Sequence, residues 1–254
     1  MILMVVKKNT LVYNSEKNSE NKMGKEILVP LESNPEVMNK FLEKLGVPSQ
    51  WRVTDVMGLE PEALAWVPRP VLSVMLLFPV SNSYEEYILK EQSNILSKGQ
   101  EVSSNIFYMK QFVGNTCGTV ALLHGVANNT DQIDLEEGHL KKFLENAKDM
   151  DATARGKLFE NCEGIIQAHK ELAQEGQTNT PRVEDPVNHH FVTFVHKDGF
   201  LYELDGSKKV FPINHGPTTP DSLLEDAAKV CKEFMARDPN DVCFTVMALA
   251  AADF

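Results

Sequence analysis

The sequence predicts a mixed α/β or α+β fold, in which helices precede and interrupt a mostly antiparallel set of strands. One observation is that three strand-like runs follow one another within residues 190–213, after several helical stretches. Another is composition: 254 residues, 43% of them hydrophobic and 24% charged, can bury one sizeable core. We expect one domain over residues 26–254. The polar stretch NSEKNSENKMGK lacks aromatic side chains, so residues 1–25 are expected to be a disordered extension.

The expected helices carry start signals or helical periodicity. In NPEVMNKFLEKLG (34–46), Asn34 can cap the first turn, Pro35 suits it, and apolar residues recur at helical spacing. SYEEYILKEQSNILSKG (83–99) is typical of a surface helix. Further helices are expected at about 137–147, at 153–172, and at 219–239 with Pro220 near its start.

The expected strands are short apolar runs between turn signals. RPVLSVMLLFPV (69–80) lies between prolines and is typical of a strand buried on both faces. HFVTFV and GFLYEL are joined by the turn HKDG, and KKVFPI follows an Asp-Gly turn. DVCFTVMALA (241–250) closes the chain as a buried strand. The polar segment 173–188 contains two prolines, and a loop of this length inside a domain is often functional.

Charge and motifs exclude several function classes. The net charge of −11 disfavours nucleic acid and anionic membranes as partners and favours a basic partner. Four cysteines without a CxxC pair favour a reducing compartment, so we expect a cytoplasmic or nuclear protein. No apolar run reaches the roughly 18 residues of a membrane span. Neither a metal site nor a cofactor is expected, because HExxH, P-loop and GxGxxG patterns are absent.

The motif QFVGNTCGTVALLHG (111–125) places one cysteine where an apolar helix begins. With Asn115 as the expected N-cap, Cys117 falls in the first turn, where free N–H groups and the helix dipole favour a thiolate. The same N–H groups can bind an oxyanion. The alternative is a small buried cysteine with no chemical role.

A cysteine nucleophile needs a base, and the base needs an orienting group. His189 and His190 open one strand, and since neighbouring strand residues point to opposite faces, one of the two can face a given site. Asp205 follows the next strand and can orient that histidine, or can serve only as a turn residue. Gln111 is a further polar group able to stabilise an oxyanion. We expect His124 in the core, and His139, His169 and His215 at the surface.

The ordered motifs Gln111, NTCG, NHHF, LYELDG and FPINHG resemble the ubiquitin carboxyl-terminal hydrolases, above all their short single-domain members. PLESNPEVMNKFLEKLG, VPRPV and LLEDAAKVCKEFMARDP extend the resemblance over roughly residues 27–251. It implies a papain-like core with a central, mostly antiparallel sheet flanked by helices, and a knotted backbone. It also implies Cys117 as nucleophile, His190 as base, Asp205 as orienting acid and Gln111 as oxyanion donor.

The resemblance further implies ubiquitin, or a ubiquitin-like modifier, as the protein substrate. It makes residues 173–188 a crossover loop over the active site that admits only small adducts or flexible tails as leaving groups. The implied substrate contacts lie in four segments: Pro30, Leu31, Glu32 and Asn34; Asp55; Ala173, Gln174, Glu175, Gly176, Gln177 and Thr178; Asp241 and Val242. Acidic residues among them suit a basic face of ubiquitin.

The expected activity is cysteine-dependent hydrolysis of the bond after the C-terminal glycine of ubiquitin. Two alternatives stay open. One is a low-turnover protein that holds free ubiquitin, and the other is a papain-like hydrolase with a different substrate.

Overall fold

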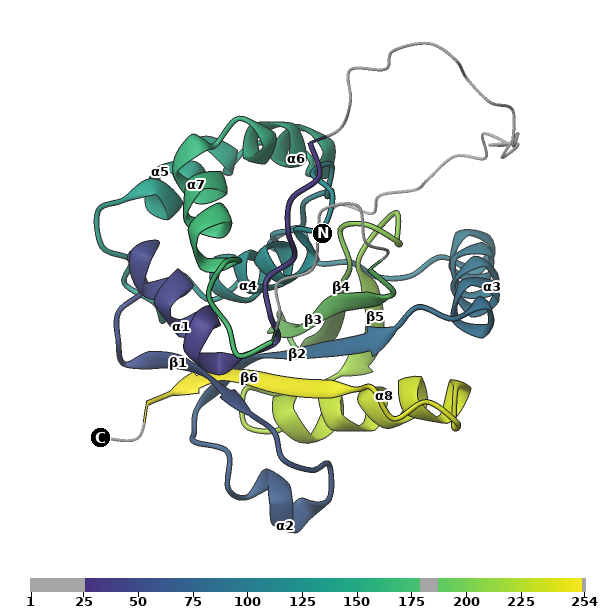
Figure 1. Cartoon of the computed structure of the whole chain (residues 1–254). Coiled ribbons are helices and arrows are strands. Elements are labelled where there is room, and N and C mark those ends of the chain that lie inside the picture. Colours follow the sequence, from purple (N-terminus) through teal and green to yellow (C-terminus); the bar gives the residue numbers. More distant parts are fainter. Residues whose placement is uncertain (1–25, 179–186, 253–254) are drawn as a thin grey trace.

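A six-stranded, antiparallel sheet forms the centre of the molecule (Figure 1). The computed structural model describes residues 26–178 and 187–252. The expected extension at 1–25 and residues 179–186 of the crossover loop lie outside this range, and the domain boundary stays a prediction. The strands, in spatial order, are β1 (Trp51–Asp55), β6 (Thr245–Ala251), β2 (Val71–Pro79), β3 (His189–Lys197), β4 (Phe200–Leu204) and β5 (Ile213–Pro217).

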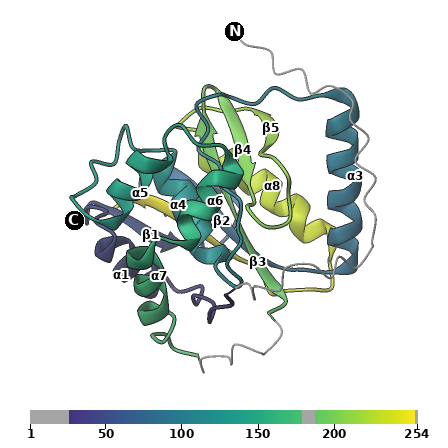
Figure 2. The ribbon, with the colours of Figure 1, turned by 90° about the horizontal axis from the view of Figure 1, so that it is seen from above.

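Helices cover both faces of this sheet, which confirms the predicted fold class (Figures 1 and 2). One core joins the sheet to helices α1 (Pro35–Lys44), α4 (Cys117–Ala127), α5 (His139–Ala147), α6 (Ala152–Glu160) and α7 (Glu163–Leu172). A second core joins the other face to α8 (Leu223–Arg237), the short α2 (Pro61–Leu64) and the buried residues of α3 (Asn82–Lys98). Strand β2 is buried on both faces, as its apolar run predicts: Met75 packs in the first core, and Val74 and Leu76 pack in the second.

Several predicted start and turn signals are confirmed. The Asn34 side chain accepts a hydrogen bond from the N–H of Glu36 and so caps α1. The β3–β4 hairpin turns through Asp198 and Gly199, both with positive φ, which matches the right-handed twist of the paired strands.

Other predicted boundaries are wrong. The single helix expected at 153–172 is two helices, because α6 ends at Glu160 and α7 begins at Glu163. At this break Gly164 lies under His139, where an added Cβ would be 2.2 Å from the imidazole ring. Strand β1 and helix α2 were not expected at all.

The third hairpin strand begins later than KKVFPI predicts, because β5 starts only at Ile213. The carboxylate of Asp205 accepts hydrogen bonds from the N–H groups of Ser207 and Lys208, which fold these residues into a turn. The Lys209 side chain is then buried instead of lying along a strand. None of the described helices is long and apolar enough to cross a membrane.

Candidate active site

Cys117 is the first residue of α4, as the motif predicts. Ten of the eleven residues in this helix are buried, and the thiol residue itself is 9% exposed. The predicted cap is wrong, since Thr116 is the N-cap. Asn115 has a left-handed backbone (φ 61°), and its side-chain amide donates to the carbonyl of Leu28. Asn115 therefore fastens the segment before α1 to the helix start instead of capping it.

His190 is the buried member of the histidine pair, while His189 is exposed. The Nε2 atom of His190 lies 2.8 Å from Oδ1 of Asp205. This bond leaves Nδ1 as the ring nitrogen that can exchange a proton with the thiol. Asp205 itself is held by the turn that follows it, so its orientation is fixed by backbone N–H groups. His190 and Asp205 follow Cys117 by 73 and 88 positions in the chain, yet the fold places the three residues together.

The three groups shift one another's acidity. Burial alone would raise the pKa of Cys117, but the hydrogen bond and charge of His190 and the N–H groups of Phe191 and Gly118 lower it overall. Burial alone would lower the pKa of His190, but Asp205 and Cys117 raise it to about 10. His190 and two backbone N–H groups in turn hold the pKa of Asp205 at about 2 against its burial. The arrangement favours a thiolate–imidazolium pair at neutral pH.

Gln111 lies beside the same group of residues. Its backbone N–H donates to the carbonyl of Gly206, the residue after Asp205. Its side-chain Nε2 donates to the carbonyl of Val113 at 3.1 Å. Its Oε1 is buried and has no hydrogen-bond partner within residues 26–178 and 187–252. The amide is therefore positioned near the helix start by its backbone, with its donor engaged in the free protein.

Two histidines expected at the surface are not there. His169 is buried, with Nδ1 2.7 Å from the Thr119 hydroxyl and Nε2 2.8 Å from the Val29 carbonyl. It ties α7 to the first turn of α4. His215 is largely buried and binds Glu203 at 2.8 Å. The predictions for His139, which is exposed, and His124, which is buried, are confirmed.

The structure joins two of the four predicted contact segments. The Glu32 carboxylate accepts hydrogen bonds from the N–H groups of Gln177 and Thr178 and from the Thr178 hydroxyl. Gly176 permits this approach, since an added Cβ would lie 2.2 Å from Glu32 Oε2. Leu31 and Ala173 are buried, so a contact with a partner would run through their backbone.

The other two segments lie elsewhere in the molecule. Asp55 ends β1 and is exposed, while Asp241 and Val242 lie between α8 and β6, with Val242 88% exposed. All of these substrate contacts stay predictions.

One neighbour of Asp205 was missed by the sequence analysis. The hydroxyl of Tyr84, at the start of α3, lies 3.5 Å from Asp205 Oδ2. Tyr84 and Ile88 are four residues apart on this helix, and this helical spacing was the available signal for a buried face there. Among the residues with defined positions, no group of three or more Cys, His, Asp or Glu side chains is placed to hold a metal ion.

The chain is similar in sequence to known proteins. A family model described as ubiquitin carboxyl-terminal hydrolase, family 1, matches residues 28–236. A ubiquitin carboxyl-terminal hydrolase of Drosophila melanogaster is 52% identical over 223 residues, which cover 88% of this chain and 97% of that protein. The human ubiquitin carboxyl-terminal hydrolase isozyme L1 is 49% identical over 226 residues, covering 89% and 99% of the two chains.

Among solved structures, the catalytic domain of Trichinella spiralis UCH37 bound to ubiquitin vinyl methyl ester has a similar fold. The TM-score is 0.68 at 24% sequence identity, and the match covers 89% of this chain and 96% of that one.

Proposed function

This chain belongs to the ubiquitin carboxyl-terminal hydrolase family 1, and from that membership we propose that Cys117, His190, Asp205 and Gln111 carry out its hydrolysis. The protein is a ubiquitin C-terminal hydrolase, a cysteine-dependent deubiquitinase. The observation that carries the residue assignment is the buried Asp205–His190 pair, bound at 2.8 Å, beside a thiol whose pKa it helps to lower.

In the proposed reaction, the Cys117 thiolate attacks the carbonyl carbon of the C-terminal glycine of ubiquitin, and the bond from this carbon to the leaving group breaks. The protonated imidazole of His190 donates its proton to the leaving amine or alcohol, and a thioester with Cys117 remains. His190 then takes a proton from water, which attacks the thioester and releases ubiquitin with a free carboxylate. Asp205 stays ionised throughout and keeps Nε2 of His190 protonated.

The oxyanion formed in each attack needs donors. The backbone N–H of Cys117 is one of the free N–H groups in the first turn of α4. The Nε2 of Gln111 is the second proposed donor, and it would leave the Val113 carbonyl when the oxyanion forms.

For the leaving group, we propose small adducts and flexible peptide tails. The described start of the crossover loop is anchored to Glu32 by four hydrogen bonds, which supports a loop held against the body of the domain. Ubiquitin is the proposed protein substrate, and a ubiquitin-like modifier is an additional candidate. The Trichinella relative was bound to a ubiquitin vinyl methyl ester, which supports ubiquitin as the first probe.

The test is reaction with a ubiquitin C-terminal electrophile, followed by mapping of the modified residue. We expect modification at Cys117, competition by free ubiquitin, and loss of both labelling and turnover in Cys117→Ala. Cys162→Ala is the matched control, because Cys162 is a free thiol at the start of α7 and away from His190. Full turnover of a fluorogenic ubiquitin ester or amide by Cys117→Ala would refute the assignment.

The same assay separates hydrolysis from the holding of free ubiquitin. A holder would bind ubiquitin tightly but turn over slowly, so steady-state kinetics are measured beside the dissociation constant. The preformed Asp205–His190 bond supports turnover.

A further inference from the structure

Helix α3 lies to one side of the molecule, with only Tyr84 and Ile88 buried (Figures 1 and 2). Its side chains nevertheless reach the segment 205–210 at four successive places. Glu85 binds Lys208, Glu91 binds Lys209, Gln92 accepts from the N–H of Val210, and Tyr84 contacts Asp205. We propose that α3 is a positioning element of the active site, and that Tyr84 and Glu91 hold the Asp205 carboxylate in its place against His190.

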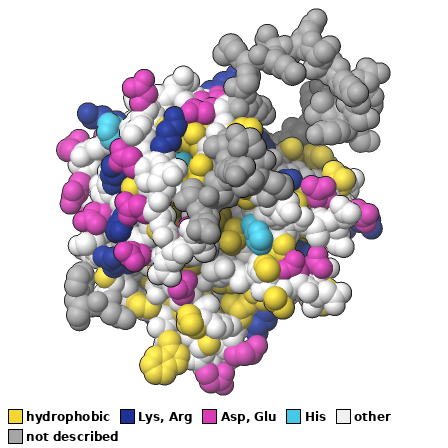
Figure 3. Space-filling model, viewed as in Figure 1, with side chains coloured by type: hydrophobic (Ala, Val, Ile, Leu, Met, Phe, Trp, Pro, Cys, Tyr) yellow, Lys and Arg dark blue, Asp and Glu magenta, His cyan; other side chains and the backbone are white. Residues whose placement is uncertain are grey.

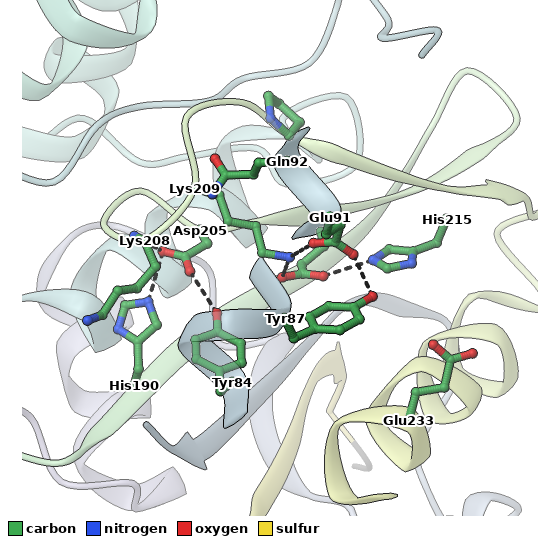
Figure 4. Close-up of polar contacts among 12 residues, drawn as sticks. Tyr84, Tyr87, Glu91, Gln92, His190, Asp205, Lys208, Lys209, His215 and Glu233 are labelled. Atoms are coloured by element: carbon green, nitrogen blue, oxygen red, sulfur yellow. Dashed lines mark hydrogen bonds and ion pairs between the residues drawn. The ribbon is translucent and has the colours of Figure 1, made fainter. Parts of the chain in front are cut away.

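The first contact of α3 is made by Tyr84 with the carboxylate of Asp205. Oδ1 of Asp205 accepts three hydrogen bonds, from His190 Nε2 and the N–H groups of Ser207 and Lys208. Oδ2 has one side-chain partner among the described residues, the Tyr84 hydroxyl at 3.5 Å (Figure 4). The three bonds to Oδ1 hold one oxygen in place, and the Tyr84 hydroxyl restrains the other, so both together limit the tilt of the carboxylate about χ2, a torsion with broad energy wells.

Tyr84 also supports His190 through an aromatic neighbour. Its ring packs edge-on against Phe78, with centroids 4.6 Å apart, and Phe78 in turn packs edge-on against the His190 imidazole at 5.8 Å. The Ser81 side chain caps α3 by accepting from the N–H of Tyr84, so the residue is fixed at the first turn of the helix. One side chain therefore bears on both members of the acid–base pair.

The second contact of α3, between Glu91 and Lys209, fixes the backbone after Asp205. The Lys209 ammonium is fully buried and lies 2.6 Å from Glu91 (Figure 4). It also lies 2.7 Å from Glu203. Burial would raise the pKa of Glu203, but Lys209 and His215 hold it at about 2. The cluster is thus charged at neutral pH, and removing one partner of such a buried pair leaves an uncompensated charge.

The inference rests on the proposed function, because it assigns α3 a role in orienting the proposed catalytic group. If Asp205 moves away from His190, the imidazolium loses its stabilising charge, and the Cys117 thiolate then loses the imidazolium. The other titratable groups that act on Asp205, besides His190 and Tyr84, are Tyr108, Lys110 and His124. None of the variants below changes them.

The experiment measures alkylation of Cys117 by iodoacetamide as a function of pH, together with kcat and KM on a ubiquitin C-terminal ester. For Tyr84→Phe we expect the alkylation midpoint to move to higher pH, and kcat to fall between about 5-fold and 100-fold with KM little changed. Glu91→Gln keeps the side-chain shape, and we expect a smaller shift in the same direction.

Tyr202→Phe is the matched control. Tyr202 is a fully buried tyrosine of β4 whose hydroxyl accepts from the N–H of Ser103, so the variant also removes one buried hydroxyl. An unchanged pH midpoint and kcat in Tyr84→Phe, or an equal change in Tyr202→Phe, would overturn the proposal. If Tyr84→Phe does not fold, Glu91→Gln decides by the same criteria.

Alkylation by iodoacetamide does not require ubiquitin, so its pH profile can be measured whether or not the protein hydrolyses ubiquitin substrates. A wild-type protein that fails to hydrolyse ubiquitin esters would refute the proposed function, whereas the pH profile would still report on the position of Asp205.

Discussion

Cys117 and His190 each make the other ionise more readily. The pKa of His190 is raised to about 10 and that of Cys117 is lowered. The thiolate–imidazolium pair therefore exists at pH values above the lowered Cys117 pKa and below the raised His190 pKa. An ordinary thiol is half ionised only at about pH 8.5. Alkylation of the wild-type protein should therefore be fast at neutral pH and should change little as the pH rises toward 9.

We predict that Asp205→Asn raises the pH at which Cys117 becomes reactive. After burial, which acts in the opposite direction, the charge of Asp205 is the largest influence on the His190 pKa and raises it. Without this charge the His190 pKa falls, the imidazolium disappears at lower pH, and the Cys117 pKa rises. Once the Cys117 pKa exceeds the pH of the assay, each further unit leaves about tenfold less thiolate. Measurement of alkylation rates across pH checks this, and a midpoint at or below the wild-type value would contradict it.

At the level of single residues, the sequence predicted which candidate side chains lie together better than it predicted which histidines are buried. A cysteine at a helix start and a histidine pair at a strand start can be found from patterns alone, but alternation leaves the choice between His189 and His190 open. His169 was placed at the surface because its sequence neighbours are polar. Its helical neighbours Ile165, Ile166 and Leu172 are buried, and helical spacing puts His169 on their face.

Elements with start signals were predicted best. Helices α1 and α3 begin at side-chain caps, and the β3–β4 hairpin turns at its Asp-Gly pair. Strand β1 was missed because its five residues, WRVTD, pair only with β6 at the edge of the sheet. No local pattern shows that Asn39, twelve residues earlier, completes this edge.

We predict that Asn39→Ala destabilises the domain through β1. The Asn39 amide donates to the carbonyl of Val53 at 2.9 Å and accepts from its N–H at 2.7 Å, so it binds both free backbone groups of an edge residue. Two hydrogen bonds of this kind contribute about 1–3 kcal/mol to the free energy of unfolding. Denaturant unfolding measures the loss.

Lys40→Ala is the control for Asn39→Ala. Lys40 is the next residue on α1 and forms only exposed ion pairs, with Glu36 and Glu175. We expect its free energy of unfolding to stay within about 0.5 kcal/mol of the wild type. An Asn39→Ala protein as stable as Lys40→Ala would show that the edge contact adds nothing.

The net charge of the whole molecule affects how strongly it attracts a charged substrate before binding. Basic and acidic side chains are interspersed over α1, α5 and α7 (Figure 3), and many of them pair, such as Lys40 with Glu175 and Lys141 with Glu137. The chain nevertheless has a net charge of −11. Such an excess attracts a basic protein surface over a distance that depends on ionic strength.

We predict that salt slows the reaction with ubiquitin substrates and leaves the chemistry of Cys117 unchanged. Between about 0.01 M and 1 M ionic strength the Debye length falls from about 30 Å to 3 Å, so the attraction of acids such as the exposed Asp55 and the partly exposed Asp241 is screened. We expect kcat/KM on a ubiquitin ester to fall about tenfold across this range. The rate with iodoacetamide, which is neutral, should stay constant.

Two acidic residues, the partly exposed Asp241 and the exposed Glu145, can locate the source of this salt dependence. Asp241 belongs to a predicted contact segment between α8 and β6, whereas Glu145 lies on α5, on the opposite side of the sheet from α8. Asp241→Asn should lower kcat/KM at low salt and flatten its dependence on salt, because one attractive charge at the contact is gone. Glu145→Gln removes the same charge from the molecule and should leave both nearly unchanged. Equal effects of the two variants would mean that net charge alone attracts the substrate and that the segment at Asp241 has no special part in binding.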